Sequence, residues 1–159
     1  MRKTWVGALR LISFLATTAV PAAATASGPG SAEKLRRLDI MLMVTSLRCR
    51  SGSDNFQADF QAFEARHLAE LNAANRQLKA DYVRSFGASG ADRALDRMST
   101  VMANQYGNGH PWLGCGDLKG LARELAETPG EAALLAAADS VLNGDGPQLA
   151  YSPGDDRLR

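Results

Sequence analysis

The chain has 159 residues, of which 45% are hydrophobic, 18 are Lys or Arg, 17 are Asp or Glu and two are Cys. These numbers exclude a polybasic nucleic-acid-binding protein, an acidic disordered chain and a cysteine-dense secreted scaffold. A chain of this length buries one hydrophobic core, so we expect a single folded domain.

The first 26 residues have the pattern of a secretory signal peptide. Arg2 and Lys3 supply a positively charged start, residues 11–20 supply an apolar run, and no acidic residue precedes Glu33. Small residues end this segment, and we expect cleavage after Ala26. The apolar run is about half of the ~20 residues that a membrane-spanning helix needs, so an uncleaved anchor is the weaker alternative and no stable membrane span should remain after cleavage.

Cleavage would change the charge of the protein. Three of the 18 basic residues and none of the 17 acidic ones lie in residues 1–26, so the mature chain has 15 basic and 17 acidic residues and a net charge of −2. Basicity therefore gives no argument for a nucleic-acid partner. The signal peptide predicts a periplasmic or secreted protein.

Cys49 and Cys115 are the only cysteines and both lie in the mature chain. Because exported proteins fold in an oxidising compartment, we expect them to form one disulfide. A redox-active thiol at Cys49, beside the charges of Arg48 and Arg50, is the alternative. The chain has no Cys-x-x-Cys and no third cysteine to resolve a mixed disulfide, which favours a structural bond.

The mature chain has the pattern of helices separated by glycine-containing breaks. The first predicted helix begins near Ser31 and ends at residues 51–53. The second, capped by Ser53 or Asp54, runs to Phe86 with Gly87 just beyond its end. The apolar stripe of the second helix is spaced by three or four residues throughout and consists of Phe56, Phe60, Phe63, His67, Leu71, Ala74, Leu78, Tyr82 and Phe86.

The length of the second helix is out of proportion to its partners. At about 33 residues it would span about 50 Å, roughly twice the length of the helices beside it. We expect either a bend near residues 73–75 or coverage of its two halves by different helices.

Three shorter helices complete the prediction. The third spans about Gly90 to Tyr106, and the fourth begins at Asp117. The segment Thr128–Glu131 combines a capping box with a proline at the first helical position and opens a fifth helix that runs through Leu142. The inward-facing residues of the third and fourth helices are predicted to be Leu95, Met98, Val101, Met102, Leu118, Leu121, Ala122 and Leu125.

No segment has the period-two pattern of a strand, so the fold class is predicted to be all-α. We expect a small antiparallel bundle of about five helices over residues 27–144 and a disordered tail over residues 145–159. In an up, down, up order of the first three helices, Cys49 and Cys115 meet at one end of the bundle.

Glu64 and His67 form a Glu-x-x-His spacing, which places a carboxylate and an imidazole on one helical face. Di-iron helical bundles use this spacing, but they need two such pairs and further carboxylates. One pair is present, so Glu64 and His67 are weak metal-ligand candidates and a core histidine with a hydrogen-bonded neighbour is the favoured interpretation. We expect no cofactor and no bound metal.

The segment 107–117 concentrates four glycines, a histidine and the only tryptophan of the mature chain. If the protein has a ligand-facing surface, we expect it here, formed by His110, Trp112 and Asp117. The alternative is a glycine-rich connector in which Trp112 closes the end of the bundle and covers the disulfide. Dinucleotide-binding, Walker, G-x-S-x-G and H-E-x-x-H motifs are absent from the sequence.

The chain also resembles a group of small exported helical proteins of Gram-negative bacteria that have no established activity. The resemblance covers residues 35–126 and implies export and an all-helical fold. Some similar chains carry the label S-adenosyl-L-homocysteine hydrolase, but this chain is far too short for that enzyme and lacks its dinucleotide fingerprint, so no catalytic residue is implied. The residues that carry the resemblance are Leu47 to Arg50, Phe60 to Asn75, Tyr82 to Gly87, Ala103 to Gly107 and Cys115.

Together these features predict an exported structural, interaction or binding protein without catalytic activity, whose partner is an envelope protein or a small ligand. The alternative is a small envelope enzyme or metal-binding protein that uses His110 with Asp117, or Glu64 with His67.

Overall fold

The computed structural model describes residues 30–143, and all of its regular structure is helical. It confirms the all-α class and the disulfide. The expected signal peptide over residues 1–26, its cleavage site and the expected tail over residues 145–159 lie outside the described residues. The helices are α1 (Ser31–Arg48), α2 (Gln57–Arg66), α3 (Leu68–Tyr106), α4 (Cys115–Glu127) and α5 (Glu131–Leu142), with a short 3₁₀ turn at Cys49–Ser51.

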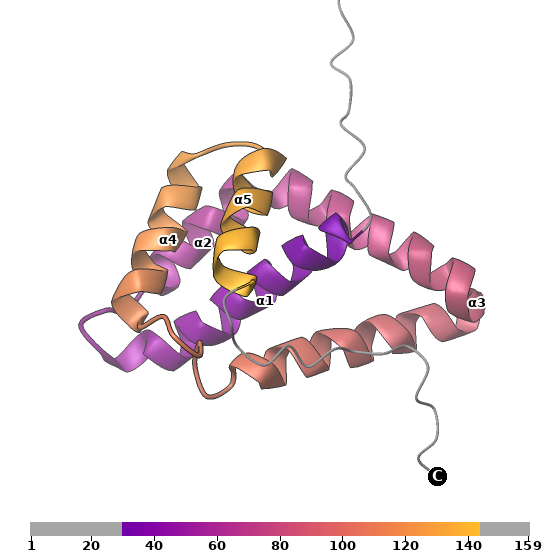
Figure 1. Cartoon of the computed structure of the whole chain (residues 1–159), viewed down its shortest axis with the longest axis horizontal. Helices are drawn as coiled ribbons and strands as arrows, with labels where there is room; N and C mark the ends of the chain where they lie inside the picture. The colour runs from indigo at the N-terminus through magenta and orange to yellow at the C-terminus, as the bar shows by residue number, and fades with distance from the viewer. Residues whose placement is uncertain (1–29, 144–159) are drawn as a thin grey trace, which may run out of the picture.

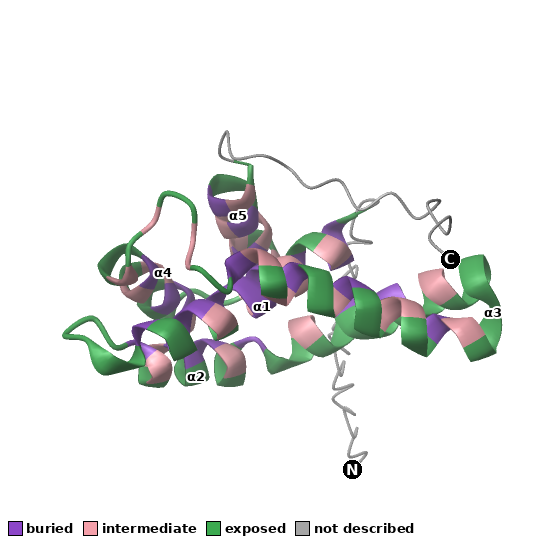
Figure 2. Ribbon diagram, turned by 90° about the horizontal axis from the view of Figure 1, so that it is seen from below, coloured by how far each residue is buried: buried purple, intermediate pink, exposed green. Residues whose placement is uncertain are grey.

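Helix α1 is the hub of the bundle because it contacts each of the other four α-helices. Figure 1 shows α5 lying across it on one side, while α3 extends past it. Buried residues concentrate along α1 and on the faces turned toward it (Figure 2). The fully covered residues of α1 include Leu35, Leu38, Met41 and Leu42. Thr45 and Ser46 are also buried, with their hydroxyls donating to main-chain oxygens one turn earlier, which satisfies them locally.

Helix α3 is folded back on itself at Gly87. This residue has φ 71° and ψ 167°, a conformation that is open essentially to glycine alone, so α3 consists of two helical halves that form a hairpin. The sequence places the end of the second predicted helix at this glycine, and the structure confirms the break. The chain therefore leaves the Cys49 end of α1 through α2 and the first half of α3 and returns on the second half (Figure 1).

Of the two alternatives for the second predicted helix, a bend near residues 73–75 is wrong. The interruption lies at His67, whose φ of −108° and ψ of 17° separate α2 from α3. His67 is fully buried, and its Nε2 lies 2.8 Å from the carbonyl oxygen of Leu125 in α4. This contact joins residues 58 positions apart and leaves no local signal, so the sequence does not indicate where the break lies.

Three predicted helix starts need correction. Helix α2 begins at Gln57 rather than after Ser53 or Asp54, and the Asn55 side chain accepts a hydrogen bond from the Gln57 N–H. Helix α4 begins two residues before Asp117. Helix α5 begins at Glu131 after Gly130, whose φ is 100°, so the predicted capping box is wrong.

In place of that capping box, Thr128 follows the end of α4 with its N–H on the Glu124 carbonyl. Gly130, with its positive φ, immediately precedes α5 and occupies the N-cap position, so Thr128 does not cap this helix.

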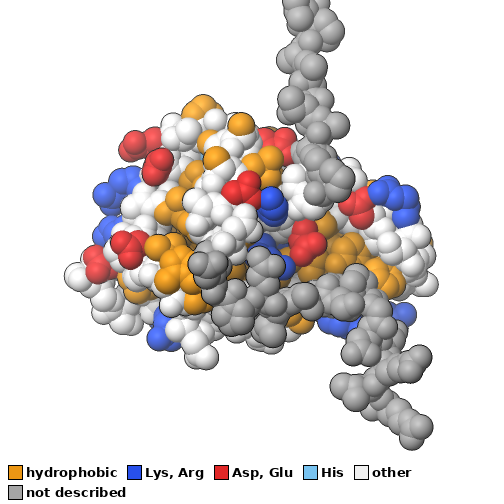
Figure 3. All heavy atoms as spheres, viewed as in Figure 1, with side chains coloured by type: hydrophobic (Ala, Val, Ile, Leu, Met, Phe, Trp, Pro, Cys, Tyr) orange, Lys and Arg blue, Asp and Glu red, His pale blue; other side chains and the backbone are white. Residues whose placement is uncertain are grey.

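The predicted inward stripes have two exceptions at the surface. Phe86, at the end of the α3 hairpin, is 40% exposed, and Val101 is 38% exposed. The hairpin extends past α1, so the side chains near Gly87 lack a helix to cover them. On the face shown in Figure 3, hydrophobic side chains reach the surface between the two halves of α3, while acidic and basic side chains are interspersed over the rest.

Candidate ligand-binding site

The segment between α3 and α4, residues 107–114, forms a loop that a covalent bond fixes to α1. Cys49 follows the last residue of α1, and Cys115 is the first residue of α4. Their Cα atoms lie 5.8 Å apart and their sulfur atoms are bonded, which confirms the predicted disulfide. The antiparallel order brings both residues to one end of the bundle, as expected. We call residues 107–114 the recognition loop.

His110 organises the recognition loop from within. Its Nε2 lies 3.1 Å from the carbonyl oxygen of Val141 in α5, and its Nδ1 lies 3.2 Å from the Leu113 backbone nitrogen and 3.4 Å from that of Trp112. A carbonyl only accepts, so Nε2 carries the proton and Nδ1 offers its lone pair to the two N–H groups. Burial lowers the pKa of His110, while the hydrogen bond to the Val141 carbonyl opposes this effect. His110 therefore serves as a neutral structural ring.

Trp112 packs against His110 and is partly exposed. Its side chain is 44% exposed, and its ring meets the edge of His110 with centroids 4.5 Å apart and an interplanar angle of 83°. On the other side His110 stacks on the buried ring of Tyr106, at 5.9 Å and 13°. The indole of Trp112 is therefore held by a series of ring contacts and is partly open to solvent.

Asp117 has a structural partner. Its Oδ2 accepts a hydrogen bond of 2.9 Å from the N–H of Gly114, the residue that precedes α4. A carboxylate at this position also interacts favourably with the positive end of the helix. The structure thus places Asp117 beside the recognition loop, where it caps α4.

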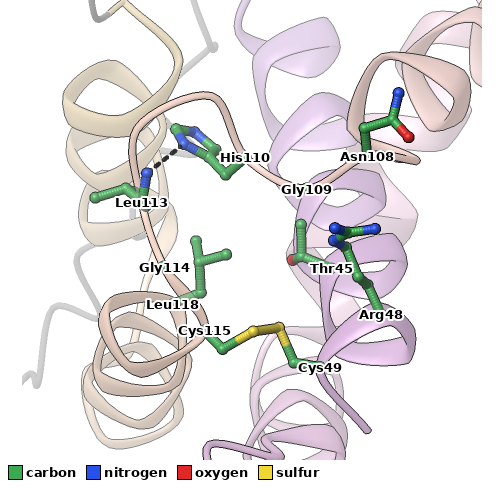
Figure 4. Close-up of a pocket in the computed structure, with 10 residues that line it drawn as sticks. All are labelled: Thr45, Arg48, Cys49, Asn108, Gly109, His110, Leu113, Gly114, Cys115 and Leu118. Carbon is green, nitrogen blue, oxygen red and sulfur yellow. Dashed lines mark hydrogen bonds between the residues drawn. A yellow bond between two sulfur atoms is a disulfide. The ribbon is translucent and has the colours of Figure 1, made fainter. Parts of the chain in front are cut away.

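A cavity of about 160 Å³ lies between the recognition loop and the end of α1. Figure 4 shows the disulfide at one end of it and the recognition loop along one side, with His110 and Leu113 on that side and Arg48 and Thr45 opposite. We call it the disulfide cavity. Besides the two cysteines and the glycines of the loop, its lining residues are Thr45, Arg48, Asn108, His110, Leu113 and Leu118.

Gly109 shapes the edge of the disulfide cavity. It has φ 102°, and a Cβ at this position would lie 3.1 Å from Nε and 3.5 Å from Cδ of Arg48. The side chain of Arg48 therefore lies directly against the loop backbone, and a larger residue at position 109 would displace it.

The structure does not bring Glu64 and His67 together as a metal site. His67 is 0% exposed, and its Nδ1 has no hydrogen-bond partner among the described residues, with the nearest carboxylate oxygen, that of Glu70, 4.0 Å away. Glu64 lines a different cavity. Within residues 30–143 no three His, Cys, Asp or Glu side chains converge in a metal-binding group.

That second cavity, of about 150 Å³, lies between α1, α2 and α3 and contains two carboxylates, those of Asp39 and Glu64. Burial raises the pKa of Asp39 from 3.8 to about 6, Arg36 opposes the shift, and the charge of Glu64 adds to it. One carboxylate oxygen of Asp39 lies 3.4 Å from Arg36, and the other is buried without a hydrogen bond in the described part of the chain. Sequence reasoning missed this cluster, because its members come from three helices and have no common spacing.

None of the helices described in the structure has both the length and the apolarity to cross a membrane. Comparison of the chain with protein-family models, with curated proteins and with solved structures finds no match.

Proposed function

We propose that this chain is an exported, periplasmic binding or interaction protein that acts without catalysis and recognises its partner with the recognition loop and the disulfide cavity beside it. One observation carries the proposal: the loop is fixed at its base by a disulfide and from within by His110, yet it presents Trp112 to solvent. An ordered, exposed aromatic residue binds at low entropic cost, because it does not have to be immobilised on contact.

The groups that an enzyme would use are engaged in structural contacts. Both ring nitrogens of His110 bind backbone groups, and Asp117 caps α4. His67 is buried and bonded to Leu125, away from any surface that a substrate could reach. These contacts favour the binding role over an envelope enzyme built on the same residues.

Export is part of the proposal and is supported by two features. Residues 1–26 have the composition of a signal peptide, and the disulfide needs an oxidising compartment. Osmotic-shock fractionation of a Gram-negative host that expresses the full chain, followed by intact mass measurement, tests this. We expect a periplasmic species that begins at Ser27. A cytoplasmic protein that retains residues 1–26 would contradict export.

The binding role is tested by site-specific photo-crosslinking in the envelope of the host. A photoreactive phenylalanine replaces Trp112 in one variant and Arg93, an exposed residue of α3, in a matched control. We expect a discrete adduct from position 112 and none from position 93. Equal labelling from both positions, or none from either, would contradict a binding surface at the recognition loop.

A further inference from the structure

The disulfide cavity has a net positive charge. Arg48 is the one charged residue that lines it, because His110 is neutral when its Nδ1 accepts hydrogen bonds from the loop. Within residues 30–143 the guanidinium of Arg48 has no ion pair and no hydrogen bond. The neighbouring carboxylate of Asp117 binds the Gly114 N–H and does not line the cavity. An anionic group would therefore meet an unneutralised guanidinium here.

The position of Arg48 depends on Gly109. Because this residue has no Cβ, the Nε and Cδ atoms of Arg48 lie against the loop backbone at the edge of the cavity (Figure 4). Asn108 lies beside Gly109, and its side-chain amide points away from the cavity (Figure 4). The planar guanidinium of Arg48 matches the two oxygens of a carboxylate, which guanidinium groups bind through paired hydrogen bonds.

Another part of the lining is apolar. Leu118 and the disulfide form an apolar wall of the cavity (Figure 4). The volume of about 160 Å³ is close to that of a cavity that accepts benzene, so it accommodates a ligand of about six heavy atoms. A short branched aliphatic group fits both the size and the chemistry of this wall.

We propose that the disulfide cavity binds a carboxylate attached to a short aliphatic group, with the carboxylate on Arg48 and the aliphatic group against Leu118 and the disulfide. This inference deepens the proposed binding function and rests on it. The same chemistry has two sources, a free short-chain acid and the C-terminal carboxylate of a peptide that ends in an aliphatic residue.

The test is a titration of the oxidised, ¹⁵N-labelled chain purified from the periplasm, followed by the backbone amide signals of Gly109 and Gly114. Isovalerate is the probe, and isovaleramide, of the same shape without charge, is its control. We expect saturable shifts with isovalerate at millimolar concentration and binding at least about tenfold weaker for the amide. Equal binding of acid and amide, or shifts that do not saturate, would overturn the proposal.

Variants of two neighbouring arginines locate the charge that matters. Arg48→Met keeps the aliphatic stem against Gly109 and removes the guanidinium, and Arg50→Met is the matched control because Arg50 is exposed and does not line the cavity. We expect isovalerate to bind at least about tenfold more weakly to R48M and unchanged to R50M, with R48K between them. Equal losses in R48M and R50M would overturn a site at Arg48.

N-acetyl-glycyl-leucine and its C-terminal amide separate the two sources. Tighter binding of the acid dipeptide than of isovalerate assigns a peptide terminus, and weaker binding assigns a free acid; either result requires that the dipeptide amide binds more weakly than the acid. Crosslinking at position 112 distinguishes failure of the carboxylate site from failure of the proposed binding function. If it yields a partner while isovalerate does not bind, the carboxylate inference fails and the binding function stands.

Discussion

His110 is the residue on which the recognition loop depends most. The neutral ring accepts the Leu113 and Trp112 N–H groups at Nδ1 and donates to Val141 at Nε2. Protonation of Nδ1 would remove the acceptor and place a charge in a half-buried position. The ring thus couples the order of the loop to pH.

The pH dependence of stability follows from this coupling. Burial lowers the pKa of folded His110 below its usual 6.5, so the unfolded chain takes up its proton first as the pH falls. The stabilising contribution of His110 is therefore complete above pH 6.5 and is lost as the pH falls through the folded pKa. We expect His110→Phe, which retains ring stacking, to cost about 1–3 kcal/mol at pH 7.5 and less at pH 5 in urea unfolding. An equal cost at both pH values would contradict the neutral role of His110.

The contribution of Asp39 to stability depends on pH in the opposite direction to that of His110. Its pKa in the folded state is about 6, against 3.8 ordinarily, because burial disfavours the charge. The folded state holds this proton more tightly, so the contribution is complete below pH 3.8 and is lost as the pH rises through about 6. We expect Asp39→Asn to raise the free energy of unfolding at pH 7.5 by about 1–2 kcal/mol, an amount reduced by the lost Arg36 pair, and to have little effect near pH 4.

The control for Asp39 is Asp92→Asn. Asp92 belongs to an exposed ion pair with Lys79, and removal of such a pair changes stability by at most about 0.5 kcal/mol. Destabilisation by D39N at pH 7.5 would show that the folded state favours the charged carboxylate. It would contradict a raised pKa of Asp39 in the folded protein.

At the scale of the elements, the boundaries that the sequence predicts correctly are those set by local backbone chemistry. Gly87 ends a helix because only glycine adopts its conformation, and Gly107 follows the last residue of α3. The apolar stripes are also predictable, since helical periodicity fixes which residues share a face. The break at His67 and the cluster around Asp39 are not, because each depends on a residue from a distant helix.

The candidate site also has features that the sequence predicts and contacts that it does not. The sequence identifies the glycine-rich segment and the cysteine pair, which are local or compositional signals. It does not reveal that His110 binds Val141, or that Gly109 lies against Arg48, because these contacts exist only after α1 and α5 have packed beside the loop. The sequence therefore places His110 in the glycine-rich segment, while its contacts follow only from the fold.

The hairpin of α3 gives a test at this scale. At Gly87 no atom lies within 4 Å of the position that a Cβ would occupy, so Gly87→Ala is penalised by the backbone alone, by about 1–3 kcal/mol. Gly120→Ala is the matched control: it also meets no atom, but it lies inside α4 and should stabilise by up to about 1 kcal/mol. Urea unfolding of both variants checks the opposite signs, and stabilisation by G87A would contradict the observed turn.

At the scale of the whole molecule, the disulfide closes a covalent loop that contains α2 and α3. Cys49 and Cys115 are 66 positions apart, and the bond between them joins α1 to α4 across both halves of α3. Chain-entropy reasoning gives a stabilisation of about 4 kcal/mol for a loop of this length. We expect the double variant Cys49→Ala/Cys115→Ala to lose about that amount in urea unfolding, and reduction of the wild type to give a similar loss. A change below about 1 kcal/mol would contradict the role of the disulfide in the fold.

Fixation of the recognition loop by the disulfide and His110 is the premise of the proposed function. Hydrogen exchange of the Trp112 and Leu113 amides, measured at neutral pH in the oxidised and the reduced protein, tests it most directly. We expect both amides to be protected in the oxidised protein and to exchange faster after reduction, while amides in the middle of α1 remain protected. Exchange of Trp112 and Leu113 at unprotected rates in the oxidised protein would contradict an ordered recognition loop.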